Sequence, residues 1–340
     1  MGPRKAALWL CGERTSNGME RMPAARRVER NGVCEDDMKH LFIINPTAGK
    51  KGGTQKLEED IRALGAAAEI VHTRETGDAR RIAREAAERG EPVRLYACGG
   101  DGTLNEVVNG AAGFANAAVT NVPIGTGNDF LKIFGPDYRA RFSDLRALSQ
   151  GPQAAMDLID CNGHLGIDIV CTGVDARIAV DKDSYKVLPL VSGIGAYIFS
   201  LVANVLFKPI SVPTVVDCGD LHFEGETTIV CVCNGRHYGG GFMPVGDNLP
   251  DDGVLETLVV PKVSRLTFFR LVGKYAKGKY RDYPELIYHR RGDGVTVRGD
   301  RELVAVVDGE PVRARELNIR LSDRKVNFFY PAGMSYAPLC

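Results

Sequence analysis

A glycine-rich stretch in the first third of the chain has the residue types of a phosphate-binding loop. Residues 98–106 read CGGDGTLNE, and they follow the apolar run 93–97 and precede apolar residues at helical spacing. The spacing predicts a strand-to-helix turn whose helix starts with Thr103 and Glu106 as a capping box. Glycines let a backbone approach phosphate closely, and a helix N-terminus supplies N–H groups and partial positive charge. A tight turn without a ligand uses the same residue types, so this stretch alone leaves both interpretations open.

Four carboxylates stand at turns where they could meet a phosphate-bearing substrate. Asp101 lies inside the glycine-rich stretch, where its charge repels a polyphosphate unless a metal ion lies between them or it binds a substrate hydroxyl. Asp129 ends a second polar loop, 123–129, and Asp308 and Glu310 lie on a turn after an apolar strand. Each has a plainer interpretation. Asp101 could belong to a simple tight turn, Asp129 could cap the helix that follows it, and Asp308 and Glu310 could form an ordinary hairpin turn.

An acidic turn in the second half of the chain offers the oxygen ligands that Mg²⁺ or Ca²⁺ prefers. Residues 249–254 read LPDDGV, and they follow the polar, glycine-rich run 234–241, NGRHYGGG. We expect both segments to interrupt a series of strands with polar chemistry.

The elements that position the first loops alternate between strand and helix, which predicts a parallel sheet with right-handed crossovers. The loops 45–53, 73–78 and 98–103 then leave the C-terminal edge of that sheet, where such folds bind ligands. Neither the Walker pattern nor the dinucleotide fingerprint occurs in the required context. The predicted strands are 41–44, 69–72, 93–97 and 118–122, and the predicted helices are capped by Thr54 and Asp78.

From about residue 152 the pattern changes to strands joined by short turns, which predicts an antiparallel sandwich. The predicted strands are 156–161, 167–171, 227–233, 254–260, 295–298, 303–307, 317–321 and 326–329. The predicted parts of the chain are a disordered or spurious extension (1–37), an α/β domain (38–151), a β-sandwich domain (152–325) and a C-terminal segment that returns to the first domain (326–340).

The composition excludes some classes of function. The 340 residues are enough for two cores, and 43 basic residues balance 43 acidic ones, which gives no support to a nucleic-acid-binding face. The nine cysteines include no CxxC pair, so we expect buried free thiols, with Cys231 and Cys233 on one face of a strand.

One segment has the length of a membrane span. Residues 187–207 carry no charge, but they contain proline, glycine, serine and asparagine, which favours a helix packed on the body near an apolar ligand site. A later helix carries aromatic and basic residues that suit either a membrane surface or a solvated face. These residues are Phe268, Phe269, Tyr275, Lys262, Arg265, Arg270, Lys274, Lys277 and Lys279.

Taken in order and at their separations, the motifs resemble the bacterial diacylglycerol kinase family of soluble lipid kinases. The resemblance covers residues 38 to about 335 and rests on NPTAG at 45–49, GGDGTLNE at 99–106, GTGNDF at 125–130, DDG at 251–253 and DGE at 308–310. It implies an N-terminal α/β nucleotide-binding domain like that of NAD kinases, with a parallel sheet, and an all-β C-terminal sandwich domain.

The resemblance also implies ATP and Mg²⁺ in the cleft between the domains. By motif, Asp101 and Asp129 would organise Mg²⁺ and substrate, and Glu310, beside Asp308, would be the general base for a lipid hydroxyl. The residues that would contact ATP are Asn45, Pro46, Thr47, Ala48, Gly49, Thr73, Gly99, Gly100, Asp101, Gly102, Thr103, Leu104, Asn105, Glu106 and Thr126.

A structural Mg²⁺ is implied at the acidic turn. Asp252 would bind it together with the backbone carbonyls of Leu249 and Val254, although residues 247–250 read DNLP where the family usually has a Pro-x-Ala run.

The implied activity is transfer of the γ-phosphate of ATP to diacylglycerol, giving phosphatidic acid. The implied partners are diacylglycerol or a related lipid and, transiently, the inner face of the membrane, reached from the cytoplasm. Three alternatives stay open, namely a kinase of sphingoid or other lipid alcohols, an NAD kinase and a catalytically silent nucleotide-binding regulator. The sequence does not fix the oligomeric state, and a homodimer stays open.

Overall fold

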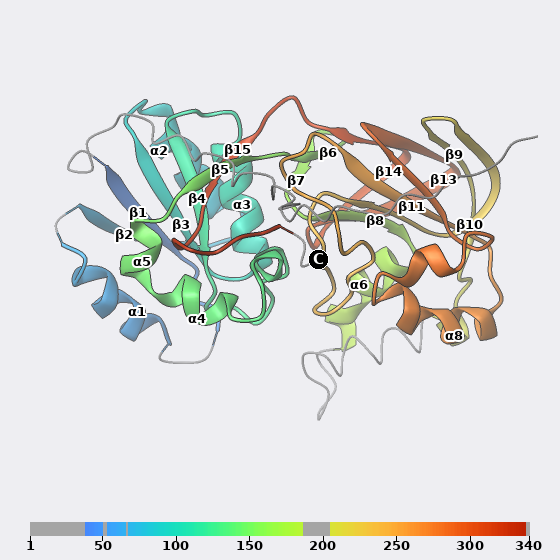
Figure 1. Ribbon diagram of the computed structural model, residues 1–340, viewed down its shortest axis with the longest axis horizontal. Coiled ribbons are helices and arrows are strands. Elements are labelled where there is room, and N and C mark those ends of the chain that lie inside the picture. The colour runs from blue at the N-terminus through green and yellow to red at the C-terminus, as the bar shows by residue number, and fades with distance from the viewer. Residues whose placement is uncertain (1–37, 50–52, 66, 186–204, 338–340) are drawn as a thin grey trace, which may run out of the picture.

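The computed structural model describes residues 38–49, 53–65, 67–185 and 205–337, which form two domains side by side (Figure 1). The predicted N-terminal extension, 1–37, and residues 186–204 of the long apolar segment lie outside the described residues. None of the described helices is both long enough and apolar enough to cross a membrane.

The first domain is the predicted parallel sheet covered by helices. Its strand order is β2-β1-β3-β4-β15-β5, in which the first five strands run parallel and β5 runs antiparallel to β15. The strands are β1 (Lys39–Ile44), β2 (Ala68–His72), β3 (Val93–Cys98), β4 (Ala117–Val122), β5 (Gln153–Met156) and β15 (Val326–Phe329). The helices are α1 (Gly53–Arg62), α2 (Asp78–Glu88), α3 (Asp101–Ala111), α4 (Tyr138–Ser143) and α5 (Leu145–Ser149), with the 3₁₀ helix η2 (Phe130–Phe134).

The end of the chain completes the first sheet. β15 lies between β4 and β5, and its Phe328 and Phe329 are buried among aromatic residues of the first domain. The ring of Phe329 meets the edge of Tyr96, which in turn stacks on Phe42 at a centroid distance of 3.9 Å. Without β15, the buried strand β4 would present an unpaired edge, so this insertion protects the sheet.

The second domain is β-rich, as the sequence predicts, and the fold class is confirmed. One nine-stranded sheet runs in the order β12-β11-β10-β8-β13-β14-β6-β7, and β9 pairs with both β10 and β13. The strands are β6 (Ile159–Cys161), β7 (His164–Gly166), β8 (Ile169–Gly173), β9 (Val212–Cys218), β10 (Leu221–Cys233), β11 (Leu255–Pro261), β12 (Tyr288–Gly292), β13 (Gly294–Val307) and β14 (Glu310–Leu321). The helices are α6 (Val174–Tyr185) and α8 (Arg265–Tyr275), with the 3₁₀ helix η3 (Lys279–Asp282).

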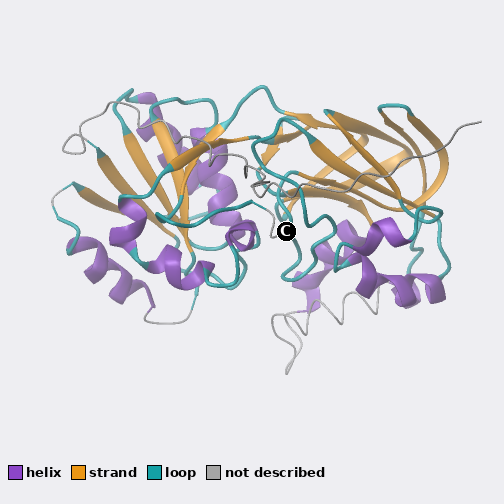
Figure 2. Cartoon of the chain, in the orientation of Figure 1, coloured by secondary structure: helices purple, strands orange, loops and turns teal. Residues whose placement is uncertain are grey.

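Two long strands make this sheet fold over on itself. β10 and β13 each pair with β9 over one part of their length and with β8 over another, so the two layers enclose a valine-rich core. The opposite face of the sheet is covered by α6 and α8, which lie below it in Figures 1 and 2. The domain is therefore a β-sandwich with a helical layer on one side.

Several predicted strand limits differ from the structure because pairing, not apolarity, sets them. The run 156–161 splits into β5, which belongs to the first sheet, and β6, which belongs to the second, and Asp157 lies at the crossing. The runs 295–298 and 303–307 join into the single strand β13, whose register against β14 shifts between Arg298 and Leu303. Cys231 and Cys233 lie on one face with their sulfurs 3.6 Å apart, as predicted.

Candidate active site

The loops that follow β1, β3 and β4 leave the first sheet at one level. Ile44 is the register partner of Cys98, and Cys98 is the partner of Val122. The backbones of the second and third loops touch, since a Cβ on Gly125 would lie 2.7 Å from Cα of Gly100. Only glycine allows this approach, which confirms that the predicted polar loops share one edge of the sheet.

The loop after β1 is fastened to the other two. Asn45 donates from Nδ2 to Oγ1 of Thr103 at 3.3 Å and accepts the Thr47 N–H at its Oδ1 at 3.0 Å. Gly49 has φ of 82°, and a Cβ there would lie 2.4 Å from the carbonyl oxygen of Ile124. Pro46, Thr47, Gly49 and Thr126 are exposed on these loops, whereas the side chain of Leu104 is buried in the core.

The first turn of α3 keeps backbone donors free. The helix begins at Asp101 with Gly100 as its N-cap, and no side chain caps it. Within the part of the chain that the structure describes, the N–H groups of Gly102 and Thr103 have no acceptor. Together with the helix dipole, these donors make the turn suited to bind a phosphate.

The predicted capping box is wrong, because Glu106 caps a different helix. Its carboxylate accepts the N–H groups of Gly77 at 2.9 Å and Ala79 at 3.0 Å, at the start of α2. Asp78, predicted as that cap, instead accepts the Arg74 N–H within the preceding loop at 2.8 Å. Glu106 therefore connects the glycine-rich loop to the loop that carries Thr73.

Asp101 and Asp129 meet at the inner end of the site. Oδ1 of Asp101 accepts the N–H of Asp129 at 2.7 Å, while the carboxylate of Asp129 accepts the N–H of Gly240 at 2.9 Å and pairs with Nζ of Lys132 at 2.5 Å. Burial, with the neighbouring Asp129 charge, raises the pKa of Asp101 to about 7. The negative charges of these two adjacent carboxylates repel each other, so a cation bound between them and a substrate would be stabilised.

The carboxylate of Asp101 fits the Mg²⁺ that the sequence resemblance implies here. Oδ2 of Asp101 has no hydrogen-bond partner among the described residues, and a Cβ on Gly127 would lie only 2.6 Å from it. Mg²⁺ is commonly held by one or two carboxylates together with substrate phosphates, so Oδ2 of Asp101 can serve as the protein ligand, whereas the oxygens of Asp129 are already bound by Lys132 and the Gly240 N–H. Among the described residues, no group of three or more His, Cys, Asp or Glu side chains is arranged around a common metal position.

Glu310 reaches the site from the second domain. Its Oε1 lies 3.7 Å from the position that a Cβ on Gly102 would take, so the carboxylate faces the first turn of α3. The residue is exposed, and although its backbone belongs to the β13–β14 pair, its carboxylate has no hydrogen-bond or ion-pair partner in the described ranges. Its carboxylate is therefore free to accept a proton from a substrate.

Asp308 holds the turn that carries Glu310. With φ of 48°, its backbone is left-handed, and its carboxylate accepts the N–H groups of Ile167, Asp168 and Ile169 at 2.7 to 3.1 Å. Nδ2 of Asn105 donates to the same carboxylate at 3.2 Å, across the domain boundary. These contacts make Asp308 a positioning residue for Glu310.

Removal of the Asp308 carboxylate should destabilise the protein. Asp308→Ala leaves three buried N–H groups without their acceptor, and we expect the free energy of unfolding to fall by about 3 kcal/mol. Urea denaturation followed by circular dichroism measures this change. Asp323→Ala, at an exposed aspartate, is the control and should change stability by less than about 0.5 kcal/mol. Equal stability of the two variants would contradict the role given to Asp308.

Three residues that shape the site are not among those predicted from the sequence. Lys132 lies one helical turn after Asp129, a spacing that could have indicated the ion pair. Arg139 donates to the carbonyls of Pro123 and Gly125, and nothing local in the sequence indicates this contact. The third is Asp168, whose buried Oδ1 has no hydrogen-bond partner among the described residues, and a Cβ on Gly235, in the predicted run 234–241, would lie 1.9 Å from that oxygen.

The loop that delivers Gly240 to Asp129 rests on a buried acid. Tyr238 donates its hydroxyl to Oδ2 of Asp175 at 3.2 Å, and burial raises the pKa of Asp175 to about 7 from 3.8. A carboxyl whose pKa is higher in the folded state stabilises the protein below its unfolded pKa, and this contribution is lost as pH rises to its folded pKa.

A pH series should reveal this buried acid. Between about pH 5 and about pH 8, we expect the Tm of the wild-type protein to fall more than that of Asp175→Asn, because asparagine does not titrate. Differential scanning calorimetry of the nucleotide-free proteins measures both slopes. Asp101 also makes Tm fall with rising pH, and it does so in both proteins. The difference between the two slopes therefore reports on Asp175. Parallel slopes would show that Asp175 titrates normally.

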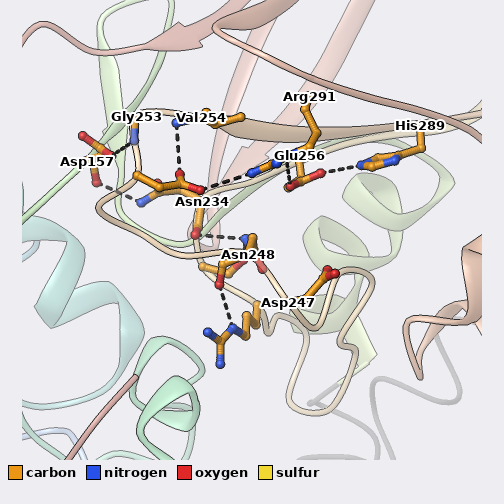
Figure 3. A network of polar contacts seen from close by, with 12 residues as sticks. Asp157, Asn234, Asp247, Asn248, Gly253, Val254, Glu256, His289 and Arg291 are labelled. Carbon is orange, nitrogen blue, oxygen red and sulfur yellow. Dashed lines mark hydrogen bonds and ion pairs between the residues drawn. The ribbon is translucent and has the colours of Figure 1, made fainter. Parts of the chain in front are cut away.

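The acidic turn lies in a separate polar network (Figure 3). Asp157 accepts the N–H of Gly253 at 2.8 Å, and Oδ1 of Asp252 accepts the N–H of Val254 at 3.1 Å. The guanidinium of Arg291 lies 3.2 Å from the other oxygen of Asp252 and 2.6 Å from Glu256. The carboxylate of Asp252, the predicted side-chain ligand, is thus already paired with a guanidinium. As arranged, this donor set does not fit a metal ion.

Chelation tests this arrangement. EDTA added to the nucleotide-free protein should leave its Tm unchanged, whereas Arg291→Gln should lower stability by about 1 kcal/mol, because two carboxylates lose their cation. Thermal unfolding with and without EDTA measures both effects. A drop in Tm with EDTA that excess Mg²⁺ reverses would instead support the metal site of Leu249, Asp252 and Val254.

Comparisons with known proteins agree with the geometry. A family model for the diacylglycerol kinase catalytic domain matches residues 39–161, and one for the YegS C-terminal NAD kinase beta sandwich-like domain matches residues 168–328. The chain is 30% identical over 309 residues to a protein from Pseudomonas aeruginosa named "Probable lipid kinase YegS-like", covering 88% of this chain and 96% of that protein. It is 28% identical over 273 residues to the "Diacylglycerol kinase" of Bacillus subtilis, covering 79% of this chain and 88% of that enzyme.

A solved structure shares the fold. The crystal structure of a diacylglycerol kinase from Bacillus anthracis superposes with a TM-score of 0.64 at 22% identity, covering 87% of this chain and 98% of that one. The two family matches span both domains, and the relatives match nearly end to end. The chain belongs to the family of lipid kinases that join a diacylglycerol kinase catalytic domain to a YegS-type C-terminal domain.

Proposed function

We propose that this lipid kinase transfers the γ-phosphate of ATP, with Mg²⁺, to the hydroxyl of diacylglycerol to give phosphatidic acid. The observation that carries the proposal is the position of Glu310. This carboxylate from the second domain, unpaired among the described residues, faces the first turn of α3, where the Gly102 and Thr103 N–H groups have no described acceptor and Asp101 lies half-buried. A proton acceptor and a phosphate-binding turn thus face each other across the domain boundary.

The residues divide the work of phosphoryl transfer between the two domains. The backbone donors of the glycine-rich loop hold the phosphates, and the loop of Asn45 closes one side of the same edge. Mg²⁺, when bound with ATP, neutralises phosphate charge beside Asp101 and Asp129. Lys132 and the Gly240 N–H hold the carboxylate of Asp129 in place.

Glu310 completes the reaction as the general base. The lipid hydroxyl gives its proton to the Glu310 carboxylate as its oxygen forms a bond to the γ-phosphorus and the bond to the β-phosphate oxygen breaks, with ADP leaving. Phosphoryl transfer depends mainly on positioning and charge neutralisation, so a single base with a preorganised phosphate site is sufficient.

The identity of the acceptor is the part of the proposal for which other substrates must be considered. Diacylglycerol is favoured because the relative from Bacillus subtilis carries the name diacylglycerol kinase, while other relatives are named only as lipid kinases. A sphingoid alcohol would use the same base and phosphate site. NAD as acceptor is less favoured because the relatives carry the names of lipid kinases, and a silent regulator would not need Glu310.

A transfer assay separates these alternatives. The protein is incubated with γ-labelled ATP and Mg²⁺, and diacylglycerol in mixed micelles, sphingosine or NAD is offered as acceptor. Labelled phosphatidic acid as the sole product supports the proposal. Product from another acceptor only would keep the site and change the substrate, and no product from any acceptor would favour a regulator.

A further inference from the structure

The second domain exposes four large apolar side chains in one region. Leu206 and Phe207 are 47% and 83% exposed, and Leu266 and Phe269 on α8 are 60% and 38% exposed. In the described part of the chain, these four are the large hydrophobic residues with exposed side chains. We call them, with the basic residues around them, the α8 face.

Hydrogen bonds hold the two parts of the α8 face together. Arg265, the first residue of α8, donates from Nε to the carbonyl of Val205 at 2.7 Å and from its guanidinium to the carbonyl of Lys208 at 3.3 Å. Leu206 and Phe207 lie between these two carbonyls. The loop is therefore fixed against the start of α8, and the four apolar side chains belong to one surface.

The helix itself has two different sides. Phe268 and Tyr275 are buried against the sheet, so neither of the two interpretations left open for them, a membrane surface or a solvated face, holds for these side chains. Leu266, Phe269 and Arg270 point outward at helical spacing. The apolar outer residues thus do not belong to the core of the domain.

The outward side of α8 is also positively charged. Arg270, Lys274 and Lys277 are exposed, and none of them is ion-paired with a described residue, while α8 itself contains no acidic residue. Lys262, just before the helix, is different because it pairs with Glu226. A surface with apolar side chains among unpaired cations is typical of a helix that lies in the interface of an anionic bilayer.

We infer that the α8 face docks on the surface of an anionic lipid bilayer, with Leu266, Phe269 and Phe207 entering the headgroup region. Charge decides between this occupant and a second copy of the chain, since two α8 faces would place Arg270, Lys274 and Lys277 against the same cations. In Figure 1, α8 lies below the second sheet at the periphery of the molecule.

This inference deepens the proposed function, since a lipid kinase must meet its substrate in a membrane. The binding itself does not depend on catalysis, so it can be measured without ATP or diacylglycerol. Each cation near an anionic surface contributes about five-fold to membrane partition, the factor that corresponds to about 1 kcal/mol.

Vesicle sedimentation tests the docking. The full chain is mixed with vesicles of phosphatidylglycerol and phosphatidylcholine, or of phosphatidylcholine alone. We expect binding to the anionic vesicles only, and a loss of roughly 100-fold in the partition coefficient for Arg270→Gln/Lys274→Gln/Lys277→Gln. Leu266→Ser/Phe269→Ser should also weaken binding, at high salt as well as at low salt, because the apolar contribution is not screened.

A matched control removes the same charge from another face. Arg313, Arg315 and Arg320 are exposed on β14, and their triple glutamine variant should bind vesicles like the wild type. Equal losses in the two triple variants, or no binding of the wild type to anionic vesicles, would overturn the inference. So would a wild-type dimer, seen by light scattering, that Leu266→Ser/Phe269→Ser converts to monomers.

Activity distinguishes a failed inference from a failed proposed function. With a short-chain diacylglycerol dispersed as monomers, the α8 variants should keep wild-type transfer, because none of the substituted side chains forms a hydrogen bond or an ion pair with Glu310 or Asp101. With long-chain diacylglycerol in anionic vesicles their activity should fall with their binding. Vesicle binding without transfer to any acceptor would sustain the docking surface and reject diacylglycerol kinase activity.

Discussion

A Glu310→Gln enzyme is expected to fold normally and to transfer phosphate about 10²- to 10⁴-fold more slowly than the wild type. Glutamine keeps the size of the side chain but cannot accept the proton of the acceptor hydroxyl. Because Glu310 is exposed and has no partner among the described residues, its replacement should leave Tm unchanged. The measurement is kcat with saturating diacylglycerol and ATP, beside a thermal melt.

The neighbouring hairpin offers a matched control for Glu310. Glu302 is an exposed glutamate of β13, the strand that pairs with β14, and Glu302→Gln should retain wild-type kcat. Loss of activity in both variants would indicate a general charge effect of the second domain. Retention in both would remove Glu310 from the mechanism and leave the proton to solvent or to a phosphate oxygen.

An Asp101→Asn enzyme is expected to lose about a thousandfold in kcat and to become more stable without nucleotide at about pH 8. The asparagine oxygen can still accept the Asp129 N–H, so the loop keeps its shape. The buried charge disappears, and with it the unfavourable energy that raises the pKa of Asp101 to about 7. Activity and stability should therefore move in opposite directions.

A fall in activity together with a rise in stability would distinguish a residue of the active site from a residue with a structural role. A merely structural Asp101 would lose stability and activity together on replacement. Asp137→Asn, at an exposed aspartate of the first domain, should change neither. The informative pair of measurements is a thermal melt at about pH 8 and a single-turnover transfer assay with the same preparation.

The sequence by itself determined where the chemistry lies along the chain. Each polar loop after an apolar run is a local pattern, so the loops of Asn45, Gly100 and Asp129 could be placed at one edge of a parallel sheet before any contact was known. The change to short alternating strands likewise predicted the β-rich second domain. These features are predictable because they depend on neighbouring residues and on the general rules of chain connection.

The tertiary structure decided which partner each polar side chain takes. Glu106 and Thr103 have the spacing of a capping box, but helix packing turns the Glu106 carboxylate to α2, whose Gly77 lies 29 residues earlier in the chain. Asp308 lies on a hairpin turn but binds backbone N–H groups about 140 residues away. Such contacts depend on the rotation of each element against another, which no local pattern contains.

The tertiary structure also decided which side chains of α8 are exposed to solvent. Phe268 and Phe269 are adjacent and identical in type, yet the first packs in the core and the second lies on the α8 face. The sequence determined that these residues and the cations form a helix, whereas docking of that helix on the sheet selected its outer side. The physical reason is that a helix can bury any one of its sides, and only the shape and apolarity of the surface it packs against decide which.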